Sequence, residues 1–280
     1  LQQQFCGTGG GEPARMVVEF TIWWILPLIL IGFTIGLLVS IFGGGGGFFY
    51  VPLLTLVFQV PTQYAVATSL ASIIPTTILG SLGHYRQGNL DVPLGLIFGV
   101  GGIVGAFFGA FASGMIPPPL MGKLFGIFMI VLSIPMLFSA RRRAGAGTGE
   151  SPPASRPLTA ARAVEGTAFG IVSGAMAGLF GVSGTPPVIA GLYLMGLPAV
   201  KVVGTSIFVL LFNAVAGLTG HLAIGQVHWG LTLFLAAGAA TGAYLGPRYL
   251  SRIKTPGLER FYGRFFTVLV ITLGIVMILE

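Results

Sequence analysis

Long apolar runs separated by short polar segments define the pattern of this chain. No Asp, Glu, Lys or Arg lies between Glu19 and Arg86, or between Glu165 and Arg248 apart from Lys201. The uncharged intervals hold apolar runs of about 20 residues, the length with which an α-helix crosses about 30 Å of hydrocarbon. Strands of a membrane barrel would alternate apolar and polar residues, and these runs do not. The pattern predicts an all-α integral membrane protein.

Ten apolar segments are predicted, five in each half of the chain. In the first half they cover residues 22–42, 48–60, 64–83, 92–113 and 121–139. In the second half they cover residues 164–181, 186–197, 202–222, 229–247 and 260–279. The second segment of each half is short, since about 12 helical residues rise only about 18 Å. Such a segment either crosses the membrane or forms a hairpin that enters part-way, and both alternatives stay open.

The two halves form an internal repeat with an offset of 137 residues. At this offset Thr68 and Ser69 fall on Thr205 and Ser206. Aligned glycines accompany them, although glycine on glycine is weak evidence in a chain with 45 glycines. The predicted organisation is a polar tail at 1–19, a first transmembrane repeat at 20–139, a linker at 140–162 and a second transmembrane repeat at 163–280.

Basic residues gather between the apolar segments and predict the topology. An excess of Lys and Arg marks the cytoplasmic loops of membrane proteins, so the net charge of +7 is not a nucleic-acid signal. Arg141, Arg142 and Arg143 place the linker in the cytoplasm, and outward counting places the basic residues at 248–264 there too. This assignment requires an odd number of crossings in each half. The two repeats are therefore predicted to be inverted relative to each other in the membrane.

Composition narrows the classes of protein further. Only 8% of the residues are charged, against about 25% in soluble domains, and 54% are hydrophobic. Cys6 is the only cysteine, which rules out an intrachain disulfide and a cysteine-based metal site within one chain. We expect no cofactor, no metal and no nucleic-acid partner. The first residues lack the basic stretch of a signal peptide and are interpreted as a polar tail.

Glycine-rich breaks separate the first two segments of each half. Residues 43–47 are five consecutive glycines, and residues 181–187 are their counterpart. Glycine costs a helix about 1 kcal/mol per residue, and matching helix breaks in inverted repeats mark transporter substrate sites. The helices that follow present N-termini, which bind anions. Close helix packing is the preferred interpretation only for Gly101, Gly105 and Gly109, spaced by four. The predicted substrate-binding residues of the breaks are Gly45, Gly46, Gly47, Ser183, Gly184 and Thr185.

One Thr-Ser pair stands early in the third segment of each half. The hydroxyls of Thr68, Ser69, Thr205 and Ser206 either donate to an anion or bond to a carbonyl one turn earlier in their own helix. Their recurrence in both halves favours substrate binding. We expect the breaks and the two pairs to face one another near the middle of the membrane. Two further residues are predicted to line this site, Ser72 and Asn213.

Three titratable residues are candidates for gating or for proton coupling. His84 falls on His221 in the repeat, and each ends a third segment. Each histidine is a pH switch, a gate, or an interfacial residue with a hydrogen bond, and the three interpretations stay open. No carboxylate lies in the interior of an apolar segment: Glu165 stands at the start of the segment 164–181, and Asp91 directly precedes the segment 92–113. Proton pumps usually keep such groups inside the membrane, so coupling to H⁺ would depend on the histidines, on Asp91 or on the substrate's own protonation. Coupling to Na⁺ through carbonyls and hydroxyls stays open as the alternative.

An enzymatic alternative rests on the second break. Ser183 within Gly-Val-Ser-Gly, together with His221, matches the pattern of rhomboid-like intramembrane serine proteases. A nucleophilic serine needs a base within hydrogen-bond reach. Ser183 falls on Gly45 in the repeat, yet His84 is present in that half without a serine to activate. The histidines therefore have another reason to be present, and no enzyme activity is predicted.

The ordered motifs resemble those of the TauE/SafE family, known as sulfite exporters. The resemblance rests on the glycine run at 42–47 with its Val-Pro-Leu-Leu at 51–54, on 65–69, on 83–91, and on glycines of the second half. It implies secondary transport, often export, of sulfite or of other small sulfur-containing or organic anions. The second half departs from the pattern at 181–190, and His228 stands where the first half has Asp91.

The expected function combines these observations. The chain is predicted to export a small anion such as sulfite or an organosulfonate by alternating access, with a passive anion channel as the alternative. Its expected location is the cytoplasmic membrane of a bacterium or an archaeon. The expected partners are the anion, the lipid bilayer and a coupling ion, either H⁺ or Na⁺. The protein is expected to act as a monomer or a homodimer.

Overall fold

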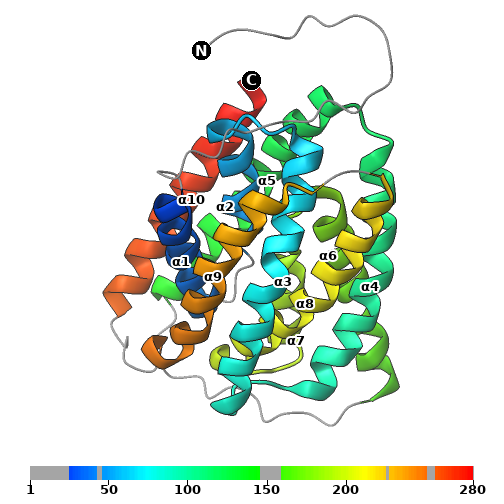
Figure 1. The fold of residues 1–280 in the computed structure, drawn as a ribbon. Helices are drawn as coiled ribbons and strands as arrows, with labels where there is room; N and C mark the ends of the chain where they lie inside the picture. Colours follow the sequence, from blue (N-terminus) through cyan, green and yellow to red (C-terminus); the bar gives the residue numbers. More distant parts are fainter. Residues whose placement is uncertain (1–24, 43–45, 146–158, 225–226, 251–255, 280) are drawn as a thin grey trace, which may run out of the picture.

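The computed structural model describes residues 25–42, 46–145, 159–224, 227–250 and 256–279. Within these ranges every regular element is a helix, and no strand is present. The prediction of an all-α protein is confirmed. The helices lie roughly along one common direction, as expected of a membrane protein (Figure 1).

The helices follow the ten predicted segments closely. The first half contains α1 (Ile25–Phe42), α2 (Gly47–Pro52), its π-helical extension η2 (Leu53–Val57), α3 (Thr62–Arg86), α4 (Val92–Gly114) and α5 (Pro118–Gly145). The second half contains α6 (Ala160–Phe180), α7 (Thr185–Leu194), α8 (Ala199–Ile224), α9 (Trp229–Leu250) and α10 (Pro256–Leu279). The widened turn of η2 directly follows Pro52, whose ring nitrogen cannot donate a helical hydrogen bond.

Helix length separates full spans from half-helices. Five helices of the described part are long and apolar enough to cross a membrane: α3, α4, α6, α8 and α9. By contrast α7 has 10 residues, and α2 with η2 has 6 and 5 residues. At 1.5 Å per residue these helices are about 15 Å long, half of the hydrocarbon thickness. Each of them therefore follows a break as a half-helix.

Glycines bring helices from opposite halves into backbone contact. A Cβ added at Gly101, Gly105 or Gly109 of α4 would overlap the backbone of α6. In return, a Cβ at Gly170 or Gly174 of α6 would overlap the backbone of α4. The close-packing interpretation of the three glycines in α4 is confirmed. Small residues take this role in membranes because dispersion contacts, rather than water exclusion, join the helices.

The same interlocking recurs between α1 and α9. A Cβ at Gly32 or Gly36 of α1 would overlap the backbone of α9, and a Cβ at Gly238 or Gly242 of α9 would overlap that of α1. In the repeat, α1 corresponds to α6 and α9 corresponds to α4. The first helix of each half thus packs on the fourth helix of the other half. The halves are interlocked rather than placed side by side.

Contacts along the helices also give their relative directions. Leu70 of α3 lies beside Gly217 of α8, whereas Gly80 lies beside Ile207, so α3 and α8 run antiparallel. The contacts of Gly126 with the residues around Ile278 show the same for α5 and α10. By contrast α1 and α3 run parallel to α9, and α6 and α8 run parallel to α4. The helices α1, α3, α4 and α5 therefore run opposite to their counterparts α6, α8, α9 and α10.

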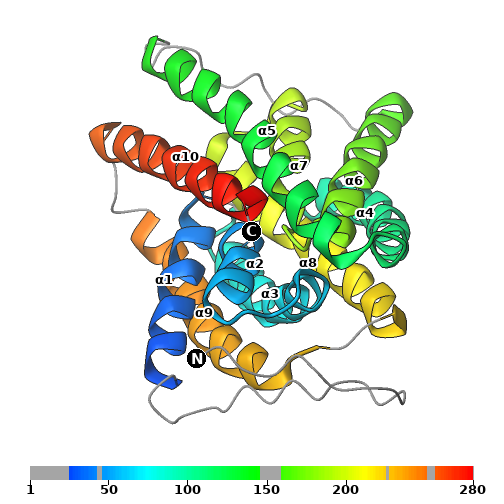
Figure 2. The same cartoon turned by 90° about the horizontal axis from the view of Figure 1, so that it is seen from above.

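The helices form two groups with α3 and α8 between them. Seen along the helices, α1 and α9 lie on one side of α3, and α4 and α6 lie beside α8 (Figure 2). The pair α5 and α10 crosses one flank of both groups. The boundary between the two groups is the α3–α8 interface.

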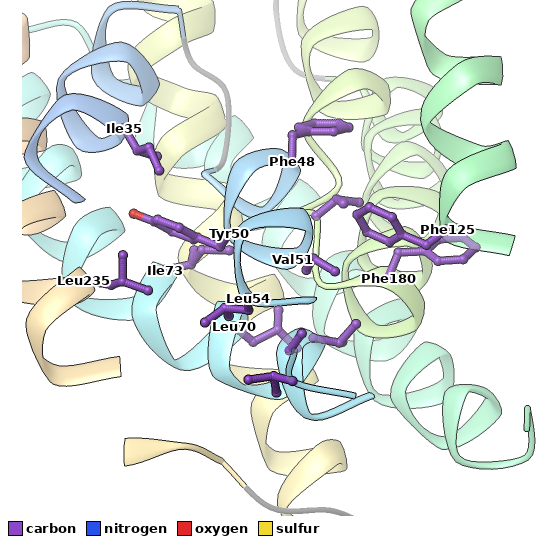
Figure 3. Packing of buried hydrophobic residues seen from close by; sticks show 14 of the residues in the cluster. Ile35, Phe48, Tyr50, Val51, Leu54, Leu70, Ile73, Phe125, Phe180 and Leu235 are labelled. Atoms are coloured by element: carbon purple, nitrogen blue, oxygen red, sulfur yellow. The ribbon is translucent and has the colours of Figure 1, made fainter. Parts of the chain in front are cut away.

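A buried apolar cluster fixes the half-helix α2 beside the second break. Tyr50, Val51 and Leu54 of α2 and η2 are fully buried against α3 and the last residue of α6, Phe180 (Figure 3). The ring of Phe180 stacks on Phe128 of α5 with the centroids 4.3 Å apart. Aromatic pairs of this kind contribute about 0.5–1.5 kcal/mol beyond their buried area. The end of α6 is therefore anchored to the first half.

The interlocking glycines predict a position-dependent cost of adding a methyl group. In Gly174→Ala the new Cβ would overlap the carbonyl of Gly102, so we expect a loss of about 1–3 kcal/mol in unfolding free energy. The matched control is Gly122→Ala in α5, where the nearest atom is the Thr62 hydroxyl oxygen at 3.3 Å. Chemical denaturation in detergent compares the two variants. Equal stability of both would contradict backbone contact between α4 and α6.

Candidate functional site

The second break is a sharply bent, fully buried loop. Gly181 has φ 68°, Ser183 has φ 61° and Gly184 has φ 67°, all in the left-handed region. Left-handed backbone suits glycine and strains residues with a Cβ, so Ser183 is the exceptional residue here. The Ser183 side chain is fully buried, and its hydroxyl donates to the carbonyl of Val182. In this structure the turn of the break is thus set by left-handed backbone at three positions.

Ser69 connects the second break to α3. Its hydroxyl donates to the carbonyl of Gly181 across 3.0 Å, and the Ser69 side chain is fully buried. Gly47, the first residue of α2, abuts the same carbonyl, so closely that a Cβ there would overlap it. The structure thus brings together Gly47, Ser69 and the second break.

Asn213 of α8 reaches the second break from the other side. Its amide nitrogen donates to the carbonyl of Ser183 at 3.2 Å and to the hydroxyl of Ser173 at 2.7 Å. Its amide oxygen is buried against Gly102 and accepts no hydrogen bond from the described residues. Ser173 of α6 was not among the predicted site residues. The only sequence signal for it is a serine within an apolar segment, at a position that carries Ile35 in the other half.

The two threonines of the Thr-Ser pairs hold helix N-termini of the opposite half. The Thr205 hydroxyl accepts from the backbone N–H of Asp91 at 2.9 Å, and the Thr68 hydroxyl accepts from that of His228 at 3.1 Å. Asp91 in turn caps α4 by accepting from the N–H of Leu94. The Nδ1 atom of His228 accepts in the same way at the start of α9. His228 therefore replaces Asp91 in the same capping role.

The two Thr-Ser pairs do not face each other. Ile207, next to Ser206, lies level with Gly80, which is 11 residues beyond Ser69 on α3. That separation corresponds to about 17 Å along the helices. The expectation that both pairs meet near the middle of the membrane is wrong, because residues early in two antiparallel helices lie at opposite ends. Asn213 lies about half-way between these two levels along α8, and the buried threonines Thr76 and Thr77 lie about half-way along the same part of α3.

His84 and His221 bond to the helices that precede the breaks. Nε2 of His84 lies 3.1 Å from the carbonyl of Ser40 in α1, and Nε2 of His221 lies 2.7 Å from that of Gly178 in α6. A carbonyl only accepts, so each Nε2 donates. Both acceptors stand two residues before the last helical residue, where a helix end leaves carbonyls without intrahelical partners. Of the open interpretations, the hydrogen-bonded one fits this geometry, and both rings are buried inside the protein.

The remaining predicted residues occupy the same region. Ser72 donates to the carbonyl of Thr68, and Ser206 donates to that of Val203. Gly46 and Thr185 are buried beside the half-helices that follow the breaks, and Gly184 is the residue before α7. Gly45 lies outside the described residues.

The start of α7 offers fewer backbone donors than an ordinary helix. Pro186 and Pro187 follow Thr185 directly, and proline has no N–H. Among the first three residues of α7 only Thr185 carries a backbone donor. An anion at this place would therefore depend on side-chain donors more than the sequence pattern suggests.

The protease pattern is not assembled in this structure. The hydroxyl of Ser183 donates to Val182, whereas the ring of His221 donates to Gly178. The two side chains are thus engaged with different carbonyls. The serine and histidine of the motif do not form the nucleophile–base hydrogen bond that such an enzyme uses.

Broken apolar helices in two interlocked halves are the architecture of membrane transport proteins. A family model described as sulfite exporter TauE/SafE matches residues 28–277. The chain belongs to this family, and the predicted resemblance is confirmed.

Curated relatives support the same class. The protein named probable membrane transporter protein YdhB, from Bacillus subtilis, is 34% identical over 228 residues, or 79% of this chain and 89% of the relative. YunE of the same organism is 32% identical, with 81% and 89% covered. A relative from Methanocaldococcus jannaschii is 27% identical, with 86% and 92% covered. No solved structure matches the chain. The protein is therefore a multi-pass membrane transporter.

The histidine contacts predict a structural cost of removing the ring. In His221→Leu the buried carbonyl of Gly178 loses its partner, so we expect about 1–3 kcal/mol less unfolding free energy. His221→Gln keeps an N–H donor and is expected to lose less. Thr219→Val is the control, since the Thr219 hydroxyl bonds only within α8, to Ala216. Denaturation in detergent measures all three variants, and equal loss in His221→Leu and Thr219→Val would refute the role.

Proposed function

We propose that this transporter carries a small anion, such as sulfite or an organosulfonate, out of the cell by alternating access. The carrying observation is a column of buried polar side chains on α3 and α8, the two helices that meet at the boundary between the groups. Two of its donors, on Ser69 and Asn213, are directed at the second break. We call this set the polar column. Its members are Thr68, Ser69, Ser72, Thr76, Thr77, Thr205, Ser206 and Asn213.

The polar column consists of eight polar side chains that are shielded inside the protein. All eight side chains are at most 1% exposed. Several hydroxyls bond within their own helix, for instance Thr76 to the carbonyl of Ser72. Ser69 and Asn213 differ, because their donors leave their own helices and reach the break. Ser and Thr are common where membrane helices pack, so the proposal rests on the two donors that leave their helices.

These two donors suit an anion better than a backbone carbonyl. A hydrogen bond to a charged group contributes about 1.5–3 kcal/mol, against about 0.5–1.5 kcal/mol between neutral groups. If the break moves away, the hydroxyl of Ser69 and the amide of Asn213 gain a free donor for the substrate. The anion then replaces the carbonyls of Gly181 and Ser183 as acceptor. Substrate binding would thereby favour a second arrangement of the break.

The interlocked packing suggests which parts move. Because α1 packs on α9 and α6 packs on α4, the sequence halves cannot rock as separate units without breaking their glycine contacts. We place the moving boundary between the group of α1, α3 and α9 and the group of α4, α6 and α8. The polar column belongs to α3 and α8, the helices that meet at this boundary, so that relative movement would open it to one face and then to the other.

The orientation in the membrane is part of the proposal. The opposite directions of counterpart helices support two inverted repeats, with the linker at 140–162 in the cytoplasm. The cytoplasmic membrane of a bacterium or archaeon is the proposed location. A gradient of H⁺ or of Na⁺ is the proposed energy source, and proteoliposomes with one imposed gradient at a time distinguish the two.

The donor pair predicts a specific transport defect. Ser69→Ala and Asn213→Ala are expected to lower uptake of labelled sulfite into proteoliposomes by about tenfold each, since each removes a bond to charge. Ser133→Ala is the matched control, because Ser133 is equally buried but bonds only to Ile130 in α5. Unchanged sulfite affinity in Ser69→Ala and Asn213→Ala would remove both residues from the substrate site.

Counterflow separates a carrier from a channel. Unlabelled sulfite inside the vesicles should accelerate entry of labelled sulfite, because a carrier returns faster when it is loaded. An organosulfonate is tested as a second substrate in the same way. Ionic conductance without this acceleration would show that the protein is a passive anion channel and not a carrier.

A further inference from the structure

Two arginines and a tyrosine converge where α3 and α9 end. Nη1 of Arg86 donates to the hydroxyl of Tyr244 at 2.6 Å. The guanidinium carbon of Arg86 lies 5.9 Å from the centre of the Tyr244 ring, and that of Arg248 lies 5.4 Å from it. The Tyr244 hydroxyl accepts from Arg86, which leaves its own O–H able to donate. Two guanidinium groups and the Tyr244 hydroxyl, all able to donate hydrogen bonds, thus meet at a single ring.

The cluster stands at the ends of two membrane-length helices. The apolar span of α3 ends at Arg86, and the apolar span of α9 ends at Arg248. These helices run parallel, so both ends lie on the same face. Both arginines are exposed, and Tyr244 is half-buried. Arginine and tyrosine at the end of a span lie at the level of the lipid headgroups.

The fold itself does not require this cluster. At the equivalent positions of the repeat, 137 residues away, stand Ala223, Phe107 and Phe111. The opposite pair of helix ends is therefore built without charge, and both phenylalanines are exposed. Arg86 and Arg248 are a feature of one face only.

The simplest explanation of the arginines is topological. Basic residues at a helix C-terminus complement its dipole and orient the chain. That explanation accounts for positive charges on this face, but it does not account for the position of two guanidinium groups at the same tyrosine ring. Two guanidinium groups and a hydroxyl that meet at one ring suit a phosphate, since guanidinium and phosphate form short, charge-assisted hydrogen bonds.

We infer that Arg86, Tyr244 and Arg248 bind the phosphate of an anionic phospholipid in the leaflet on this face. The two guanidinium groups and the tyrosine O–H supply the donors, and the neighbouring apolar spans supply the surface for the acyl chains. The ligand is a lipid rather than the transported anion, because the cluster lies at the end of the spans and outside the polar column. Basic sites between transmembrane helices commonly select anionic headgroups.

Lipid titration of the purified full-length chain tests the inference. Native mass spectrometry compares phosphatidylglycerol with phosphatidylcholine for the unmodified chain, Arg86→Gln, Arg248→Gln and Tyr244→Phe. We expect preferential binding of phosphatidylglycerol by the unmodified chain, and about tenfold weaker binding in each arginine variant. Tyr244→Phe keeps the ring and is expected to lose less.

The control removes a charge without touching the ring. Lys201 of α8 is exposed on the same face, as the contact of Gly204 with His84 shows. Lys201→Gln should keep the affinity for phosphatidylglycerol. An equal loss in Lys201→Gln and Arg86→Gln would overturn the inference in favour of general charge attraction. Inorganic phosphate is the second probe, and displacement of the lipid by millimolar phosphate would reassign the cluster to a soluble anion.

Discussion

The need to satisfy backbone groups at broken helices governs the structure of this transporter. In a bilayer an unpaired carbonyl costs several kcal/mol, because no water is present to bond it. Here side chains from neighbouring helices provide the donors: Ser69 and Asn213 at the second break, His84 and His221 at the helix ends before the breaks. The broken helices are thereby tied to α3 and α8. The same ties place polar groups where a substrate could compete for them.

Glycine contacts make this arrangement possible by interlocking the two halves. Since α1 packs on α9 and α6 packs on α4, each half completes the other, and α3 and α8 are left facing each other at the boundary. Thr205 and Thr68 add hydrogen bonds between the halves, because their hydroxyls accept from the backbone N–H groups of Asp91 and His228, the residues just before α4 and α9. The boundary between the two helix groups therefore differs from the boundary between the repeats in sequence.

The departures of the second half from the first have physical explanations of different kinds. His228 in place of Asp91 keeps a helix-capping acceptor, so the substitution preserves a local bond. Pro186 and Pro187 remove backbone donors at the start of α7, which shifts hydrogen bonding at the second break to side chains. At the ends of α3 and α9 the two halves differ in charge, because arginines stand at one pair of helix ends and uncharged residues stand at the equivalent pair. The two halves are thus alike in helix packing, whereas side chains at some equivalent positions differ in charge and in hydrogen bonding.

The sequence by itself determined the helical class, the ten segments, the short half-helices and the family, because apolar run length and glycine runs act locally. It also identified Ser69, Asn213 and the histidines as residues of interest. Tertiary structure decided their partners. Antiparallel packing separated the two Thr-Ser pairs, and interlocking brought Ser173 to Asn213. Such contacts join residues far apart in the chain, and no local pattern encodes which faces of two helices meet.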